Sequence, residues 1–422
     1  MSDPERRFSV RIRVQLALIA VVAAAVLLAT WQFSEASGTY QDAVRQDVKR
    51  QAAVLEDIRY VYGDEAPLAL RVAASHARAD GLEAVKGQGR VAASEHTLAA
   101  QTAFSLRRAA EPGSLLGNGG YRHQDLGYDL PRRLADVQRR TPELYDVDPG
   151  ATLRAGDRQV AWGLACAAVA VAAVLLAVVT GNVVRPRRWR RTPAPGGPRV
   201  LRAVEIIPQP AVTTRNRRAA QLHLFVFAML LLLPLGQILA AGNEQRAQAE
   251  AARRAVQLST SITAHGQRTA FLTEGLRAAE AAALQATARE FASLETGVSP
   301  QEARHEQTVA IVENVIAQQV RKIVDYMGRP PTATDGVDPA AVAALGRAPE
   351  RLSNAQAEQV RQVDLAERAS RRALFLASAT AVAVVAEALA ATALTTMRRA
   401  WWFWLAGTSG VTLLLVSFAL VG

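Results

Sequence analysis

Five long apolar stretches constrain the fold more than any other feature of this sequence. Each is close to the roughly 20 residues that a helix needs to cross about 30 Å of hydrocarbon. Together they contain a single Asp, Glu, Lys or Arg residue, Glu387. They cover residues 14–33, 160–183, 222–241, 373–396 and 401–421. The sequence therefore predicts an all-α membrane protein with five transmembrane helices.

The positive charge of the chain, formally +11, is concentrated in short connections between these stretches. Residues 185–218 carry ten arginines against one glutamate, and residues 1–13 carry four arginines against two acids. Basic residues in short connections stay on the cytoplasmic side. We therefore expect a cytoplasmic N-terminus (1–13), linker (184–221) and turn (397–400), with an extracytoplasmic C-terminus. Basicity then reports topology, and no nucleic-acid partner is expected.

The composition also suggests where the protein resides. Of 49 basic residues only Lys49, Lys86 and Lys322 are lysine, a bias typical of high-GC bacteria. The first apolar stretch begins like a secretory signal, but Glu35 stands where cleavage needs a small residue, so we expect an uncleaved anchor. The predicted location is the bacterial plasma membrane, crossed several times.

The two long segments between the apolar stretches are similar in length and placement. Residues 34–159 number 126 and residues 242–372 number 131, and each is enclosed by two predicted spans. A shift of 209 positions also aligns three pairs of identical residues: His96 with His305, Gly127 with Gly336, and Asp129 with Asp338. We therefore predict a tandem repeat with two extracytoplasmic helical-bundle domains, followed by an added fifth span.

Helix signals recur in both segments. In the first, Gly63 and Pro67 predict that one helix ends and the chain restarts. Ser299, followed by a proline and Glu302, predicts a capping box that starts a helix ending near Met327. Asp338 before a proline predicts another helix start, and Ser353 is the predicted cap of the last helix, which enters the fourth span. Residues 111–131 of the first segment are rich in glycine and predict a mobile surface loop.

The linker between the halves is rich in proline and arginine, a composition that does not support a packed core. We expect its first arginines to contact anionic lipid headgroups, where each is worth about 1 kcal/mol. They are Arg185, Arg187, Arg188, Arg190 and Arg191. An acidic cytoplasmic protein is the alternative partner.

Glu387 is the main candidate site, because an acid within a span costs roughly 3 kcal/mol on insertion scales. If the fourth and fifth spans form a hairpin, Thr408 and Ser409 lie at the depth of Glu387 and could hydrogen-bond it. Such a group is either a structural clasp or a site that handles protons or cations.

The third span contains Pro234 and Gly236. Proline removes one backbone hydrogen bond and kinks a helix. The pair is a candidate hinge, with a static packing feature as the alternative.

No catalytic, cofactor or metal motif is predicted. The three lysines do not fit a phosphate-binding loop, and the sequence around His305 lacks the second histidine of a zinc protease. The histidines of the two long segments are interpreted as packing or surface residues; they are His76, His96, His123, His265 and His305. We expect a non-enzymatic protein without cofactors.

In its order of span, helical segment and span, the chain resembles the sensory half of bacterial chemoreceptors and histidine kinases. It shares no motif with them, and no signalling domain follows the spans. We expect a receptor or scaffold that binds an envelope component or ligand and acts through partner proteins or as a homo-oligomer. A subunit of a transporter or channel that uses Glu387 is the first alternative, and a membrane enzyme the second.

Overall fold

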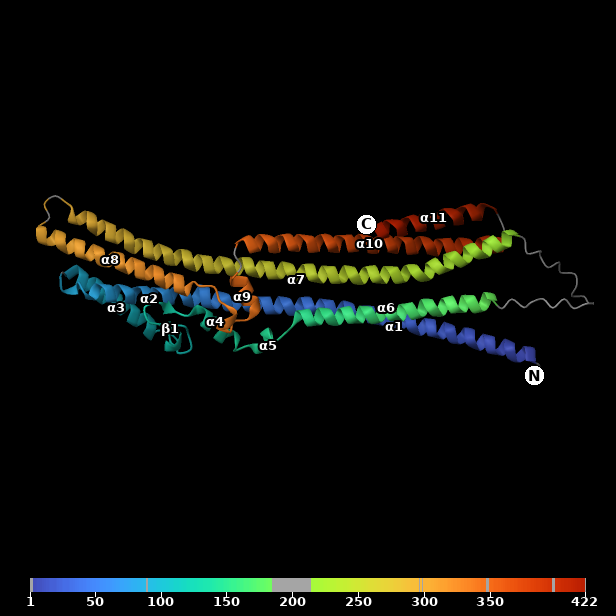
Figure 1. Ribbon diagram of the computed structural model, residues 1–422, viewed down its shortest axis with the longest axis horizontal. Coiled ribbons are helices and arrows are strands. Elements are labelled where there is room, and N and C mark those ends of the chain that lie inside the picture. Colours follow the sequence, from blue (N-terminus) through green and yellow to red (C-terminus); the bar gives the residue numbers. More distant parts are fainter. Residues whose placement is uncertain are drawn as a thin grey trace, which may run out of the picture. The chain divides into compact units, whose positions relative to one another are not determined.

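The computed structural model describes residues 3–88, 90–183, 214–295, 297, 299–346, 349–396 and 399–421. Nearly all of them lie in helices, as predicted. The rest consists of turns, loops and an antiparallel hairpin of two short strands, β1 (Arg122–His123) and β2 (Gly127–Tyr128) (Figure 1).

The long helices far exceed the length of a bilayer crossing. In chain order the α-helices are α1 (Asp3–Ile58), α2 (Ala66–Glu83), α3 (Arg90–Arg108), α4 (Leu130–Gln138), α5 (Pro142–Tyr145), α6 (Pro149–Val183), α7 (Thr214–Ser293), α8 (Pro300–Met327), α9 (Pro339–Leu345), α10 (Pro349–Thr396) and α11 (Arg399–Val421). Three 3₁₀ turns lie at Lys86–Gln88, Gly119–Tyr121 and Ala333–Asp335, and a π-helical turn, η1, at Arg59–Glu65.

The chain divides into two compact units. Unit 1 comprises Met1–Ala43, Pro149–Ala251 and Arg361–Gly422, and unit 2 comprises Val44–Asp148 and Ala252–Val360.

Unit 2 contains one hydrophobic core to which both long segments contribute. Tyr62 and Leu134 of the first segment are buried in the same cluster as Phe271, Val324 and Met327 of the second. The rings of Tyr62 and Phe271 meet edge to face, with centroids 6.4 Å apart. The two segments, each of which we predicted to form a helical bundle, therefore share one core.

α1 does not break where Gly63 and Pro67 suggested a restart. Instead η1 connects it directly to α2, and the helical backbone continues through the π-helical turn. Pro67 has no N–H group, so the α-helical hydrogen bond to residue 63 cannot form. The wider turn absorbs this loss without ending the helix.

Two turns of unit 2 have the same local construction. Gly127 and Gly336 both adopt a positive φ, of 91° and 73°, which a side chain would oppose. Two residues later, Asp129 and Asp338 cap α4 and α9 by accepting a backbone N–H. Each cap also receives an arginine from the other segment: Arg329 lies 3.1 Å from Asp129, and Arg50 lies 2.6 Å from Asp338. The caps therefore also join the two segments.

Helices long and apolar enough to cross a membrane run through unit 1, and two of them continue into unit 2. Among the described side chains, three stretches qualify by length and composition: Ala20–Glu83, Pro149–Leu176 and Ser353–Leu389. They overlap the first, second and fourth predicted spans and indicate membrane association. The fifth predicted span corresponds to the shorter apolar stretch Phe403–Ala419 in α11. The third predicted span begins within α7 at residues whose side chains lie outside the described part.

The helices of unit 1 bury mainly alanine. Ala29 is 1% exposed and Ala379 is fully buried, whereas Leu27 is 71% and Phe403 79% exposed. Large apolar side chains facing outward are the arrangement that lipid favours, with small residues where helices meet.

Candidate functional site

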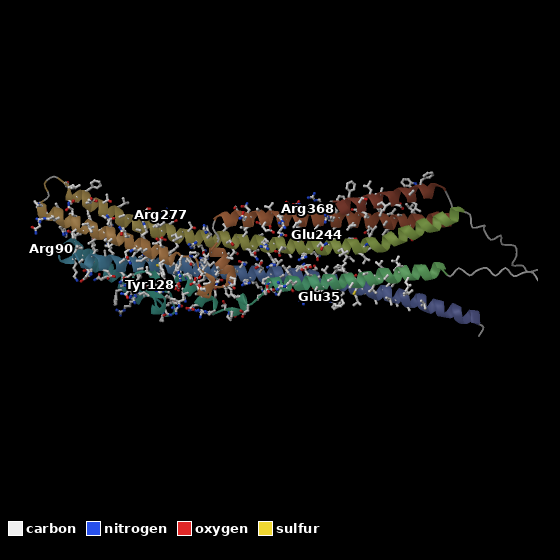
Figure 2. The ribbon with its side chains drawn as sticks, in the orientation of Figure 1. Glu35, Arg90, Tyr128, Glu244, Arg277 and Arg368 are labelled. Carbon is white, nitrogen blue, oxygen red and sulfur yellow. The ribbon has the colours of Figure 1, made fainter. Side chains whose placement is uncertain are left out.

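The best candidate site is a cavity of about 410 Å³ in unit 2. Three elements form it: α2, the β1–β2 hairpin and α8. Its polar lining residues are His76, Asp80, Arg122, His123, Gln124, Asp125, Tyr128 and Gln319, and its apolar ones include Ala73, Val315, Ile316 and Ile323. Figure 2 labels Tyr128 in this part of the molecule. Both long segments therefore contribute to one cavity.

The hairpin lies in residues that we expected to form a mobile loop, and that expectation was wrong in part. Tyr121, directly before β1, and Tyr128, in β2, are both buried, and the Asp129 N–H donates to the Tyr121 carbonyl at 2.8 Å. Gln319 of α8 donates to the backbone carbonyl of Asp125. The glycines permit tight turns, and the two tyrosines then fix the turns to the core.

A buried ion pair lies next to the residue that precedes the hairpin. Arg133 of α4 is 0% exposed and donates through Nε and Nη2 to the two oxygens of Glu65, at 2.7 and 2.8 Å. Its guanidinium also lies 5.7 Å and 5.6 Å from the ring centroids of Tyr60 and Tyr121. Burial lowers the pKa of Arg133, but the hydrogen bonds and charge of Glu65 more than offset this effect, so the pKa is raised. Arg133 therefore stays charged and contacts Tyr121, the residue directly before the hairpin.

Two polar atoms at the cavity have no hydrogen-bond partner within the described structure. They are the hydroxyl of Tyr128, a residue only 2% exposed, and the buried Nε2 atom of His76. A buried polar group without a partner costs about 1–3 kcal/mol, so it calls for a specific explanation such as a bound molecule.

The electrostatics of the cavity set the protonation of both groups. Burial, followed by the charges of Arg122 and Arg107, lowers the pKa of His76 below its usual 6.5, while Asp80 opposes the change. Burial raises the pKa of Tyr128, against the same two arginines. At neutral pH the Tyr128 hydroxyl is therefore a donor and the His76 imidazole is uncharged.

Three charged side chains also line the cavity. Arg122 lies in β1, Asp125 at the hairpin turn and Asp80 one helical turn after His76 on α2. Within the described part of the chain, none of the three forms an ion pair. The cavity thus offers charges of both signs.

The predicted intramembrane site consists of Glu387, Thr408 and Ser409. Glu387 is half-buried in α10. The Thr408 hydroxyl donates to the carbonyls of Trp404 and Leu405 in its own helix, at 3.0 and 3.1 Å. The buried Ser409 hydroxyl makes no hydrogen bond within the described residues. Neither hydroxyl donates to Glu387, whose role stays a prediction.

The predicted hinge and the predicted lipid contacts stay predictions. α7 runs unbroken through Pro234, and an added Cβ at Gly236 would lie 3.8 Å from the Leu376 side chain, an ordinary contact distance. The predicted lipid contacts Arg185, Arg187, Arg188, Arg190 and Arg191 lie outside the described residues.

In the described part of the chain, no group of three or more His, Cys, Asp and Glu side chains could hold a metal ion. Of the histidines, His96 pairs with Glu83 at 2.7 Å. Comparison with protein-family models, with curated proteins and with solved structures found no match.

Sequence reasoning missed the cavity because it joins three elements that are distant in the sequence: Arg122 of the hairpin follows Asp80 of α2 by 42 positions, and Gln319 of α8 follows Tyr128 by 191. The sequence predicts His76 to be a packing or surface residue, and it singles out neither Tyr128 nor Arg122. One signal was available: Gly127 and Asp129 are among the residues that the 209-position shift aligns. Tyr128 lies between them, where the other half has Val337.

Proposed function

We propose that this chain is a non-enzymatic, multi-pass receptor of the bacterial plasma membrane. In this proposal unit 2 lies outside the cytoplasm, binds a small ligand in its cavity and acts through partner proteins. Five helices cross the bilayer, with the N-terminus inside and the C-terminus outside. The arginines of the 184–221 linker contact anionic lipid headgroups.

The observation that carries the proposal is the continuity of three helices. α1, α7 and α10 each contribute residues to both units without interruption. Because a helix is stiff, ligand binding that shifts one end can displace the other. A cavity with unpartnered polar atoms, formed by both segments, is the second support.

A tandem origin of the two halves is part of the same proposal. The shared turn of a positive-φ glycine followed by a capping aspartate supports it, since both features recur at the 209-position shift.

The topology can be tested with reporter fusions after residues 148, 200, 300 and 422, using one reporter active only outside the cytoplasm and one active only inside. We expect the outside reporter to be active at 148, 300 and 422, and the inside reporter at 200. Inside activity at 148 or 300 would contradict a receptor with unit 2 outside.

The receptor role can be tested by crosslinking the chain in native membranes and identifying its partners. Recovery of a protein with a cytoplasmic signalling domain supports the proposal. Recovery of a transport ATPase instead would favour the alternative, a transporter or channel subunit.

That alternative rests on Glu387, a carboxyl group within a helix apolar enough to span. Glu387→Gln should abolish proton or cation flux in proteoliposomes if Glu387 conducts, whereas Glu367→Gln, an exposed position of the same helix, should not. Background flux in the unmodified protein would remove the transport alternative.

A further inference from the structure

We propose that the cavity of unit 2 binds a small zwitterion of the amino-acid type. The carboxylate would face Tyr128 and Arg122, and the ammonium group would face Asp80 and Asp125. This inference deepens the proposed receptor function by naming its ligand class.

The Tyr128 hydroxyl is the first argument. The turn that contains Tyr128 does not need a hydroxyl, because Val337 fills the corresponding position of the other segment and is also buried, at 5% exposure. The aromatic ring can pack as the valine does, but the hydroxyl then has no hydrogen-bond partner in the described structure. A donor that packing does not require, buried without a partner beside a cavity, indicates a ligand acceptor.

The charge around Tyr128 indicates that this acceptor is anionic. Arg122 lines the cavity, and it acts with Arg107 on both Tyr128 and His76. A carboxylate would accept from the Tyr128 hydroxyl and from the guanidinium. Charge-assisted hydrogen bonds of this kind are roughly twice as strong as neutral ones.

The acids indicate a cation in the same ligand. Asp80 and Asp125 line the same cavity, and neither forms an ion pair in the described part of the chain. A purely anionic ligand would leave both carboxylates facing its charge. A molecule with an ammonium group near its carboxylate neutralises both sides.

The remaining features fit a small molecule of this class. The volume of about 410 Å³ is near the lower end for ligand pockets, roughly 300–1,000 Å³. The apolar lining of Ala73, Ile316 and Ile323 can receive a side chain, and the uncharged His76 imidazole can donate or accept one hydrogen bond.

The test uses the purified full chain in lipid nanodiscs. Binding is measured by calorimetry and by thermal shift for the standard L-amino acids. Each amino acid that binds is then compared with its amide, which lacks the carboxylate, and its deaminated acid, which lacks the ammonium group. We expect each loss to weaken binding at least about tenfold.

Variants with matched controls locate the site. Tyr128→Phe and Arg122→Gln should each weaken binding about tenfold, and Asp80→Asn should weaken the zwitterion more than its deaminated acid. Tyr62→Phe is the control for Tyr128, because Tyr62 is also buried with an unpartnered hydroxyl but does not line the cavity. Arg108→Gln controls for Arg122. Melting without ligand confirms that each variant is folded.

Three results would overturn the inference: no amino acid binds, the amide or deaminated acid binds as tightly as the zwitterion, or Tyr128→Phe behaves like Tyr62→Phe. None of these affects the topology or the partner that the receptor proposal predicts. Conversely, a zwitterion bound in the cavity without any signalling partner would overturn the receptor proposal and leave the ligand class standing.

Discussion

The two units bury different kinds of residues. In the described structure, every buried charged residue lies in unit 2; these are Asp47, Glu65, Asp129, Arg133 and Glu313. Unit 2 also buries large apolar side chains such as Leu134 and Met327, whereas unit 1 buries mainly alanine and exposes leucine, phenylalanine and tryptophan.

The difference reflects the solvent that each unit is suited to. In water, burying large apolar groups stabilises a fold by about 25 cal/mol per Å². In lipid that driving force disappears between helices, and close approach of small residues replaces it. One chain therefore follows two packing rules, and four substitutions test whether each rule holds in its own unit.

The largest effect should come from Arg133→Ala, because it leaves Glu65 charged and buried. Losing one partner of a buried pair costs about 3–5 kcal/mol. Denaturant unfolding measures the lost stability. Hydrogen exchange, followed in peptides from each unit, should place the loss in unit 2.

Two controls sharpen this prediction. Arg132→Ala, at the exposed neighbouring position, should change stability by no more than about 0.5 kcal/mol. The double variant Glu65→Leu, Arg133→Met should recover much of the loss, since apolar replacement of a buried pair is often neutral. If Arg133→Ala is as stable as the unmodified protein, unit 2 does not depend on buried charge.

Gly156→Ala should have the next largest effect and act on unit 1. The added Cβ would lie 2.6 Å from the Tyr40 ring, and overpacking of this kind costs about 1–3 kcal/mol. The measurement is thermal unfolding in nanodiscs.

Gly38→Ala is the matched control, because a Cβ there meets nothing within 4 Å. Removing a glycine from a helix interior should stabilise the protein by roughly 0.5–1 kcal/mol. Equal effects of the two substitutions would contradict close small-residue packing in unit 1.

Ser299→Ala should destabilise α8 of unit 2 by about 1 kcal/mol. Ser299 accepts the Glu302 N–H at 3.2 Å, and Glu302 accepts the Ser299 N–H at 3.1 Å. Hydrogen exchange of the first turn of α8 measures the loss. Unchanged exchange would mean that this helix end does not depend on its cap in water.

The smallest effect should be on the pH dependence of stability in Glu313→Gln. Burial raises the pKa of Glu313 above its usual 4.5, against the charge of Arg78 at 2.8 Å. A raised carboxyl pKa contributes stability that is fully present below pH 4.5 and is lost as pH rises through the folded-state value. Glu313→Gln removes that loss. The substitution should therefore change the free energy of unfolding more favourably at pH 7 than at pH 4.

Glu302→Gln should show the opposite sign, because hydrogen bonds from Ser299 lower the pKa of Glu302. Its contribution is present above pH 4.5 and lost as pH falls. If the free energy of unfolding changes with pH in the same way in Glu313→Gln and Glu302→Gln, the opposite directions of the two pKa shifts are contradicted.

Local signals in the sequence predicted much of this fold. The capping box at Ser299, the end of α8 at Met327 and the start of α9 after Asp338 are all confirmed. Such features depend on neighbouring residues alone. The last long helix begins at Pro349, four residues before the predicted cap at Ser353, because proline is also favoured at a first helical position.

The shared core and the cavity could not be predicted in this way. They depend on contacts such as Arg78 with Glu313, 235 positions apart, and Gln319 with Asp125, 194 apart. Periodicity shows which face of a helix is apolar but not which distant helix covers it. The five-span count and the role of Glu387 stay predictions.

The shared core also has a consequence for biosynthesis. The Asp338 N–H donates to the Gln138 side chain across 200 positions, so the first segment of unit 2 cannot complete its contacts when it is made. At about 5–20 residues per second, a ribosome needs about 10–40 s to synthesise the intervening chain. During that interval Tyr62 and Leu134 lack their later neighbours. Two separately expressed halves of the chain should therefore assemble only when both are present.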